Sequence, residues 1–168
     1  VVVMTSQAMQ FSPYIEEAIL AQQRAVRTLA YDLHTNSSML GENQIARLSR
    51  AKLVVLPSPQ TLSQRAWDSL LAYVRSGGNL LVTGPVERDE HWYPADRLAA
   101  LTHSNVFALQ THYSEIKVGN ERVPLSYNYQ RQQRLERLDG VSGVQEIQLG
   151  KGHIFVTAEP VELAENPD

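Results

Sequence analysis

The feature that most constrains this chain is a stretch in its middle, residues 51–85, with the sequence AKLVVLPSPQTLSQRAWDSLLAYVRSGGNLLVTGP. Residues 53–56 and 80–82 are short, continuously apolar runs, which are typical of strands buried on both faces of a parallel sheet. A strand, a crossover helix and a second parallel strand form a right-handed unit on which the rest of the chain must pack. Between the two runs, apolar residues recur at helical spacing and predict one inward stripe. These residues are Leu62, Ala66, Trp67, Leu70, Leu71 and Val74.

The ends of this central helix are predicted from its capping residues. Thr61 is expected to be the N-cap, with Gln64 completing a capping box three residues later. Gly77 and Gly78 follow the last helical residues, at a position where a left-handed residue ends a helix most easily. The residues expected to be almost fully buried in this unit are Leu53, Val55, Leu70 and Leu81.

The residues before the central unit are predicted to add two strands and two helices. Residues 1–4 form the first strand and residues 5–11 a polar loop. A helix is expected to begin at Ser12, a plausible N-cap. Residues 28–33 are predicted to contain the second strand, although residues 29–31 could still be helix, and residues 43–50 are predicted to form a short helix. The inward stripe of the long helix is expected to comprise Ile15, Ala18, Ile19, Val26 and Leu29.

The last third of the chain follows a different pattern. After a short helix at residues 95–101, strands are predicted at residues 106–109, 115–118 and 122–125, and a hairpin at residues 145–157. The fold class is therefore predicted to be α/β. We expect a flavodoxin-like three-layer sandwich whose mainly parallel sheet gains antiparallel strands in the C-terminal third.

Composition excludes several classes of function. The chain has 168 residues and no cysteine, which excludes disulfides, thiolate metal sites and cysteine nucleophiles. Its 18 acidic and 15 basic residues give a net charge of −3, so nothing attracts nucleic acid or an anionic membrane at long range. No apolar run approaches the roughly 18 residues that cross a bilayer. Neither nucleic acid nor membrane is expected as a partner. We expect a soluble protein, with the cytoplasm slightly favoured as its location.

Ligands of open parallel sheets bind outside the carboxyl ends of the strands. These ends are predicted at residues 5–12, 34–36, 58–60 and 84–93. None of them carries a phosphate-binding glycine motif, and the turn after the fourth strand offers no nucleophile. Ser58 is expected to be a turn or cap residue. No catalytic, cofactor-binding or metal-binding residue is therefore assigned, and no cofactor is expected.

The longest of these loops, residues 86–93, combines charged and aromatic side chains. Exposed apolar patches mark contacts, and Trp and Tyr dominate the energetics of interfaces. The loop is therefore predicted to contact another domain, another subunit or a sugar, although its aromatic residues could equally cover the sheet edge. A metal site made by His91 with Asp89 or Glu90 is a further alternative. The candidate contact residues are Glu87, Asp89, His91, Trp92 and Tyr93.

Three arginines recur every third residue, at Arg131, Arg134 and Arg137. They could form an anionic site or a partner-facing helix. A solvated face, paired with Glu136 and Asp139, is the favoured interpretation because no aromatic platform accompanies the charges.

The central stretch resembles the class I glutamine amidotransferase-like fold. More narrowly, it resembles the non-catalytic trimerisation domain that follows the catalytic barrel in family-42 β-galactosidases and related bacterial glycoside hydrolases. The sequence motifs that carry this resemblance are LVVLPS at residues 53–58 and VRSGGNLLVT at residues 74–83. The ending, residues 149–163, resembles the exit toward a final β-domain. The likeness covers residues 1–163 as a single domain and leaves residues 164–168 as the start of an exit linker.

The resemblance implies a non-catalytic domain, cut from a longer polypeptide, that supports oligomerisation or shapes the mouth of a carbohydrate active site. Its expected partners are the catalytic barrel of the same polypeptide, other subunits of a homo-oligomer, and carbohydrate. Glutaminase chemistry is not expected because the family's cysteine is missing, and no activity is expected of this chain alone. One alternative is a stand-alone sugar or small-molecule enzyme that uses His91, Asp89 and Glu90 with a metal. Another is an interaction module of a different multidomain protein.

Overall fold

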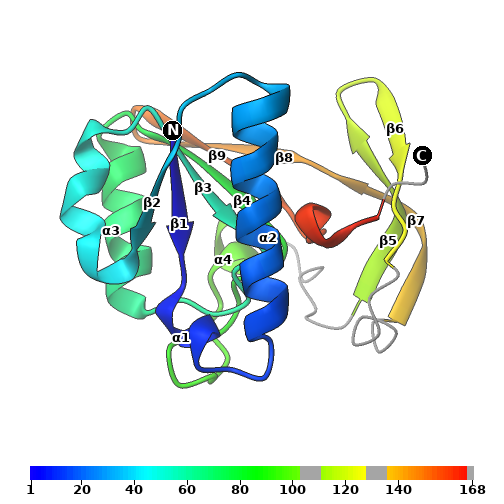
Figure 1. Ribbon diagram of the computed structural model, residues 1–168, viewed down its shortest axis with the longest axis horizontal. Helices are drawn as coiled ribbons and strands as arrows, with labels where there is room; N and C mark the ends of the chain where they lie inside the picture. The colour runs from blue at the N-terminus through cyan, green and yellow to red at the C-terminus, as the bar shows by residue number, and fades with distance from the viewer. Residues whose placement is uncertain (103–110, 128–135, 166–168) are drawn as a thin grey trace.

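The computed structural model describes residues 1–102, 111–127 and 136–165, which form an α/β structure with two sheets (Figure 1). The main sheet has six strands in the order β2-β1-β3-β4-β9-β8, and the small sheet has three in the order β6-β5-β7. Strands β2, β1, β3, β4 and β9 run parallel, and β8 is antiparallel to β9. The fold is thus α/β with a mainly parallel main sheet.

The elements up to the last strand of the central unit are β1 (Val2–Thr5), α1 (Gln7–Gln10), α2 (Ile15–Arg27), the π-helical η1 (Thr28–Asp32), β2 (Ser38–Gly41), the 3₁₀ segment η2 (Glu42–Arg50), β3 (Leu53–Pro57), α3 (Gln64–Arg75) and β4 (Asn79–Thr83). The later elements are α4 (Leu98–Thr102), β5 (Thr111–Val118), β6 (Glu121–Pro124), β7 (Glu136–Gly143), β8 (Gln145–Leu149), β9 (Gly152–Thr157) and the 3₁₀ turn η4 (Val161–Leu163). No helix among the described residues is long and apolar enough to cross a membrane.

The central unit, β3-α3-β4, is confirmed. The N–H of Gly77 donates to the carbonyl of Val74 and the N–H of Gly78 to that of Tyr73, at 2.9 and 3.1 Å, which closes the end of α3. Gly77 has φ 116°, the left-handed conformation that this cap needs. The predicted N-cap was wrong: Ser63, whose Oγ accepts from the N–H of Ala66, begins α3.

Thr61 is not a cap because its hydroxyl is used elsewhere. It is buried and donates to the carbonyl of Asp89, which ties the loop after β3 to the loop after β4. The capping-box pattern selects the wrong hydroxyl here, since Gln64 stands three residues after Thr61 whereas Ala66 stands three residues after Ser63.

Helices lie on both faces of the main sheet. Alternate strand residues such as Leu56 and Val82 pack with Trp67 and Leu70 of α3 in one apolar cluster. Val3 lies on the opposite face and packs with Ala25 and Leu29. Of the four residues predicted to be almost fully buried, Leu70 and Val55 are buried as expected. The other two, Leu53 and Leu81, are only half-buried.

The half-burial of Leu53 and Leu81 has a structural reason. Both alternate with the residues that face α3, so they lie on the opposite face of the sheet, where α2 packs over β1 and β3. Leu53 is the first residue of β3, and Leu81 lies one strand further from β1. Full burial was wrongly predicted because the sequence does not reveal how far each helix extends over the sheet.

The long helix α2 also differs from its prediction. It begins at Ile15, and Ser12 instead stabilises the preceding turn by accepting from the N–H of Tyr14 at 3.1 Å. Ile15 and Ile19 are 38% and 45% exposed, whereas Ala18, Ala21 and Ala25 are buried. Close approach of α2 to the sheet therefore selects small side chains over large apolar ones. The buried residues of α2 are Glu17, Ala18, Ala21, Gln22 and Ala25.

The predicted second strand at residues 28–33 was wrong. These residues continue α2 as η1, because Leu29 lies on the same buried face as Ala25. The second strand is instead β2, so residues 34–36 precede it and do not lie at its carboxyl end. The carboxyl end of β2 is followed by Glu42.

The strands of the C-terminal third were only partly placed by the prediction. The β8-β9 hairpin joins the main sheet, but β9 does so parallel to β4 and only β8 is antiparallel. The other strands form the small sheet, in which β5 pairs antiparallel with β6 and parallel with β7. In Figure 1, η4 lies between α2 and the small sheet. Predicted strand 106–109 and the arginines at 131 and 134 lie outside the described residues, and Arg137 lies within β7.

Candidate functional site at the carboxyl edge of the main sheet

The carboxyl edge of the main sheet has two differently built halves. We call the part after β3, β4 and β9 the closed half, because the chain that follows β9 returns across it. We call the part after β1 and β2 the open half, because an open groove lies there. The loop after β4, residues 86–97, joins the two.

Glu162 is the centre of the closed half. Its carboxylate accepts from the hydroxyl of Thr83 at 2.6 and 2.7 Å and from that of Ser58 at 3.0 Å. Thr83 in turn accepts from the N–H of Ser58 at 3.2 Å. Burial raises the pKa of Glu162, although the hydroxyl donors partly oppose the shift. Ser58 therefore has the turn role that the sequence predicted, and it also holds a carboxylate that the sequence did not identify.

A second carboxylate of the closed half, Glu159, joins the two sheets. Its side chain is 1% exposed and accepts from the N–H of Tyr113 at 3.0 Å and from the hydroxyl of Tyr127 at 3.1 Å. Burial, with the nearby Glu159 carboxylate, raises the pKa of Tyr127 well above its usual range. Tyr127 is thus a neutral donor at any physiological pH, and Glu159 holds the small sheet against the carboxyl edge.

The tip of the loop after β4 is held by its own side chains. Asp89 Oδ1 accepts from the N–H of His91 at 2.8 Å and from that of Tyr93 at 2.9 Å. Arg88 Nη1 donates to the carbonyl of Trp92 at 2.9 Å. These bonds stabilise Trp92 at φ 66°, a conformation that non-glycine residues adopt only when their surroundings impose it.

Two residues of the alternative metal site are engaged by different partners. Asp89 is used within the loop, and Glu90 Oε2 accepts from the N–H of Gln64 at the start of α3, at 3.1 Å. Over the described part of the chain, no three His, Asp or Glu side chains converge as metal ligands.

The base of the same loop depends on Arg97, which the sequence analysis missed. Its guanidinium donates to the carbonyls of Leu62, Arg88 and Val86 at 2.7, 2.9 and 3.3 Å, although the side chain is only 4% exposed. Burial lowers the pKa of Arg97, and the Glu87 carboxylate opposes that shift. The carbonyls that accept from Arg97 are brought together only by the folded loops, so no sequence pattern predicts the burial of this side chain.

Glu87, a predicted contact residue, has a role inside the loop. Its carboxylate accepts from the N–H of Arg97 at 2.9 Å and from that of Leu98 at 2.5 Å, which caps the start of α4. Burial raises the pKa of Glu87, and these two backbone bonds oppose the rise. The structure therefore places Glu87 at the base of the loop, away from the exposed residues at its tip.

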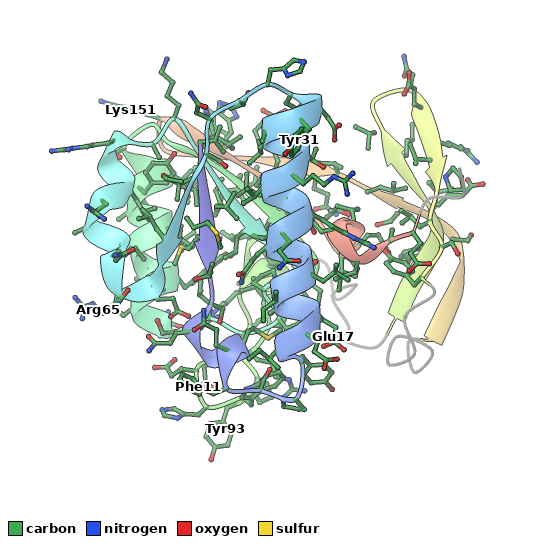
Figure 2. All side chains as sticks on the ribbon, viewed as in Figure 1. Phe11, Glu17, Tyr31, Arg65, Tyr93 and Lys151 are labelled. Carbon is green, nitrogen blue, oxygen red and sulfur yellow. The ribbon has the colours of Figure 1, made fainter. Side chains whose placement is uncertain are left out.

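Aromatic side chains gather at the tip of the loop and at the start of α2. Trp92 is half-buried and stacks on Tyr14, with ring centroids 5.6 Å apart and an interplanar angle of 24°. Tyr93 is 67% exposed, and Phe11, which follows α1, is 84% exposed. Both project from the lower end of the molecule in Figure 2. The sequence analysis singled out Trp92 and Tyr93 but missed Phe11 and Tyr14, which lie in a segment assigned to a loop and a helix start.

The open half holds a groove of about 410 Å³. Its walls come from segments that follow four strands: α1 after β1, η2 after β2, the start of α3 after β3, and the loop after β4. Charged, amide and aromatic side chains line it together. They include Gln7, Phe11, Glu42, Asn43, Arg65 and Glu90.

No family model and no curated protein matches this sequence. Solved structures share its fold. Gan42B, a GH42 β-galactosidase from G. stearothermophilus, is 14% identical with a TM-score of 0.60, over 93% of this chain and 27% of that one. The exo-β-1,4-mannosidase Op5Man5 from Opitutaceae bacterium strain TAV5 is 12% identical with a TM-score of 0.63, over 96% of this chain and 31% of that one.

A β-galactosidase from Bacillus circulans sp. alkalophilus is 11% identical with a TM-score of 0.53, over 98% of this chain and 28% of that one. At these identities the likeness shows a shared fold. In each case this chain spans less than a third of the protein that it matches.

Proposed function

We propose that this chain is a non-catalytic α/β domain of a bacterial glycoside hydrolase, and that it supports subunit assembly or shapes the mouth of the sugar-binding site. The observation that carries the proposal is the share of each chain that the structural likeness covers. It spans nearly all of this chain and less than a third of a β-galactosidase and of a mannosidase. A domain of a larger hydrolase accounts for both fractions.

The flavodoxin-like layering expected from the sequence forms part of this proposal. Along the main sheet the parallel strands follow the order 2-1-3-4-5 when numbered along the chain, with β9 as the fifth. That order is typical of doubly wound folds of the flavodoxin type. Apolar clusters on both faces of the sheet support the same layering.

The closed half supports a non-catalytic role. Gly84 occupies the position after β4 where an amidotransferase-like enzyme would carry its nucleophile. Its N–H donates to the carbonyl of Thr157 at 2.9 Å. A Cβ at Gly84 would meet the Cα atoms of Pro160 and Ser58 at 3.4 and 3.5 Å. Pro160 of the returning chain and Ser58 of the loop after β3 thus lie directly beside the position of the missing nucleophile.

The exposed apolar residues around α2 support a contact role. Large apolar side chains that stay exposed in a group mark interaction surfaces, and aromatic residues are enriched in the cores of interfaces. We call this group the α2 patch. It comprises Phe11, Tyr14, Ile15 and Ile19, with exposures of 84%, 39%, 38% and 45%.

The test is an Ile19→Asp variant in the complete polypeptide. A charge in the α2 patch should weaken assembly of the hydrolase or raise its KM, while the circular dichroism of the domain stays unchanged. Met39→Asp is the matched control, because Met39 is similarly exposed, at 51%, but lies on edge strand β2. Equal effects of the two variants would contradict the assignment of this patch.

A second measurement tests the absence of catalysis. The purified 168-residue chain should hydrolyse neither glutamine nor a chromogenic β-galactoside. Turnover of either compound that is lost on changing Asp89 or His91 would show that the chain is itself an enzyme and would overturn the proposal.

A further inference from the structure

The groove of the open half lies at the topological switch point of the main sheet. The strand order reverses at β1, which has β2 on one side and β3 on the other. In open α/β sheets, the loops on either side of such a point diverge and leave a crevice at the carboxyl ends, where ligands bind. The groove is lined by residues that follow β1, β2, β3 and β4, so it is this crevice.

Hydrogen bonds to the backbone fix the carboxylates of the groove in place. Glu42 Oε1 accepts from the N–H of Gln7 at 2.7 Å, and Glu42 Oε2 accepts from the N–H of Ser63 at 3.1 Å. Glu90 Oε2 accepts from the N–H of Gln64 at 3.1 Å. Each carboxylate oxygen can accept a further hydrogen bond, so both groups are preorganised acceptors.

The other walls supply donors and an apolar surface. Arg65 offers guanidinium donors, and the side-chain amides of Gln7 and Asn43 can both donate and accept. Phe11 lines the same groove and is 84% exposed, so one face of its ring is free to receive a ligand. In Figure 2, Arg65 lies at the left edge of the molecule and Phe11 at its lower end.

We infer that this groove binds a neutral carbohydrate of one or two rings. A sugar ring carries hydroxyl groups that both donate and accept, and its C–H face packs on an aromatic ring. The groove offers carboxylate acceptors, guanidinium and amide donors, and an exposed phenyl ring in one concavity. Its volume of about 410 Å³ lies within the range of small-molecule sites, about 300–1,000 Å³.

A phosphorylated ligand fits the groove less well. Glu42 and Glu90 outnumber the single cation Arg65 among the residues that line it, so the local charge repels an anion. The loops around the groove also lack the glycine-rich sequence that cradles phosphate. Binding of a neutral sugar needs no catalysis by this chain, so the inference goes beyond the scaffold role and does not depend on it.

The experiment is a titration of the ¹⁵N-labelled chain, followed by heteronuclear NMR, with methyl β-galactoside and methyl β-mannoside as probes. Saturable shifts are expected at the amides of Gln7, Ser63 and Gln64, which donate to the groove carboxylates. Phe11→Ala and Arg65→Ala should each weaken binding about tenfold. Tyr31→Ala is the matched control, since Tyr31 is 74% exposed at the far end of the α2–η1 helix, and it should leave the affinity unchanged.

Several outcomes would overturn the inference. They are the absence of a saturable shift with either sugar, shifts that Phe11→Ala and Arg65→Ala leave unchanged, or displacement of the sugar by inorganic phosphate. Self-association that Phe11→Ala abolishes, with no sugar shift, would make the groove a protein interface instead. If Phe11→Ala unfolds the chain, Arg65→Ala still decides, because Arg65 is exposed on α3. Failure here leaves the activity and assembly tests of the scaffold role unaffected.

Discussion

The two halves of the carboxyl edge lie at the ends of neighbouring strands of one sheet. Their carboxylates differ in the groups that hold them. In the closed half, Glu162 lies in the chain that returns after β9. Its carboxylate accepts from the hydroxyls of Ser58 and Thr83. In the open half, Glu42 and Glu90 are fixed by backbone N–H groups, and Glu42 is half-buried while Glu90 is exposed. The path of the chain after the last parallel strand therefore decides which part of the edge can receive a ligand.

This difference predicts how each half responds to change. A buried carboxylate depends on every donor around it, because a group that loses its partner inside the protein keeps the full cost of its desolvation. A surface carboxylate can exchange a lost partner for water. Substitutions in the closed half should therefore change stability, whereas substitutions in the open half should change binding and leave stability almost unaltered.

The largest loss of stability is expected in α3, because this helix supports both halves of the carboxyl edge. Leu70 of α3 is 0% exposed and packs against the sheet, while the first residues of α3 form a wall of the groove. Leu70→Ala should lower the free energy of unfolding by about 2–5 kcal/mol, the range for leucine truncation in a packed core. Chemical denaturation measures it. The neighbouring Leu71 is half-buried, and Leu71→Ala should cost clearly less.

A change confined to the closed half comes next in size. Thr83→Val keeps the shape of the side chain but removes the hydroxyl that donates to Glu162 and accepts from Ser58. We expect a loss of about 1–3 kcal/mol, the cost of leaving buried polar groups unsatisfied. Ser69→Ala, which removes a hydroxyl bonded to the carbonyl of Arg65 within α3, is the control and should be nearly neutral. A neutral Thr83→Val would mean that water enters the closed half.

The closed half should also make stability depend on pH in an identifiable direction. Burial raises the pKa of Glu162, so the folded state favours the protonated carboxyl. The contribution of the Glu162 carboxyl to the free energy of unfolding is then fully present below the ordinary glutamate pKa of about 4.3. It is lost as pH rises through the higher pKa of Glu162 in the folded state. A Glu162→Gln variant cannot ionise at this position, so it does not lose this stability. The melting temperature of the variant, relative to that of the parent chain, should therefore increase as pH rises from about 4 to about 7.

The exposed Glu121 in β6 provides the control for this pH series. Glu121→Gln should follow the parent chain at every pH. A Glu162→Gln variant that also follows the parent chain would show that the carboxylate is solvated in solution.

The sequence predicted the central unit because local and long-range signals agree there. Apolar runs fixed β3 and β4, and Gly77 and Gly78 fixed the end of α3. It failed at β2, where a short strand that is exposed on one edge of the sheet has little apolar pattern, while Leu29 made the end of a helix resemble a strand.

The candidate sites were harder to predict because they depend on contacts between distant segments. Glu162 meets Thr83 across 79 positions of sequence and Ser58 across 104. The groove gathers residues that follow four different strands. Composition indicated that Trp92 and Tyr93 were unusual in a polar loop, but only the fold shows that Tyr14 lies against Trp92.

A further change in stability is expected at Trp92, which is half-buried in the loop that joins the two halves. Trp92→Ala removes a ring stacked on Tyr14, and aromatic pairs of this kind contribute about 0.5–1.5 kcal/mol beyond the area that they bury. The domain should remain folded. In the complete polypeptide we expect weaker assembly or a raised KM, because the loop tip loses the support that orients it toward a partner.

Two further variants separate support from direct contact. Tyr14→Ala removes the other ring of the same pair, so if Trp92 acts through stacking, the double variant should lose little more stability than either single one. Tyr93 is 67% exposed, so Tyr93→Ala should leave stability unchanged while it weakens any contact that the tip makes directly. If Trp92→Ala instead unfolds the domain, Trp92 is a structural lid on the carboxyl edge. The contact surface would then be restricted to the α2 patch, where Ile19→Asp tests it without disturbing the loop.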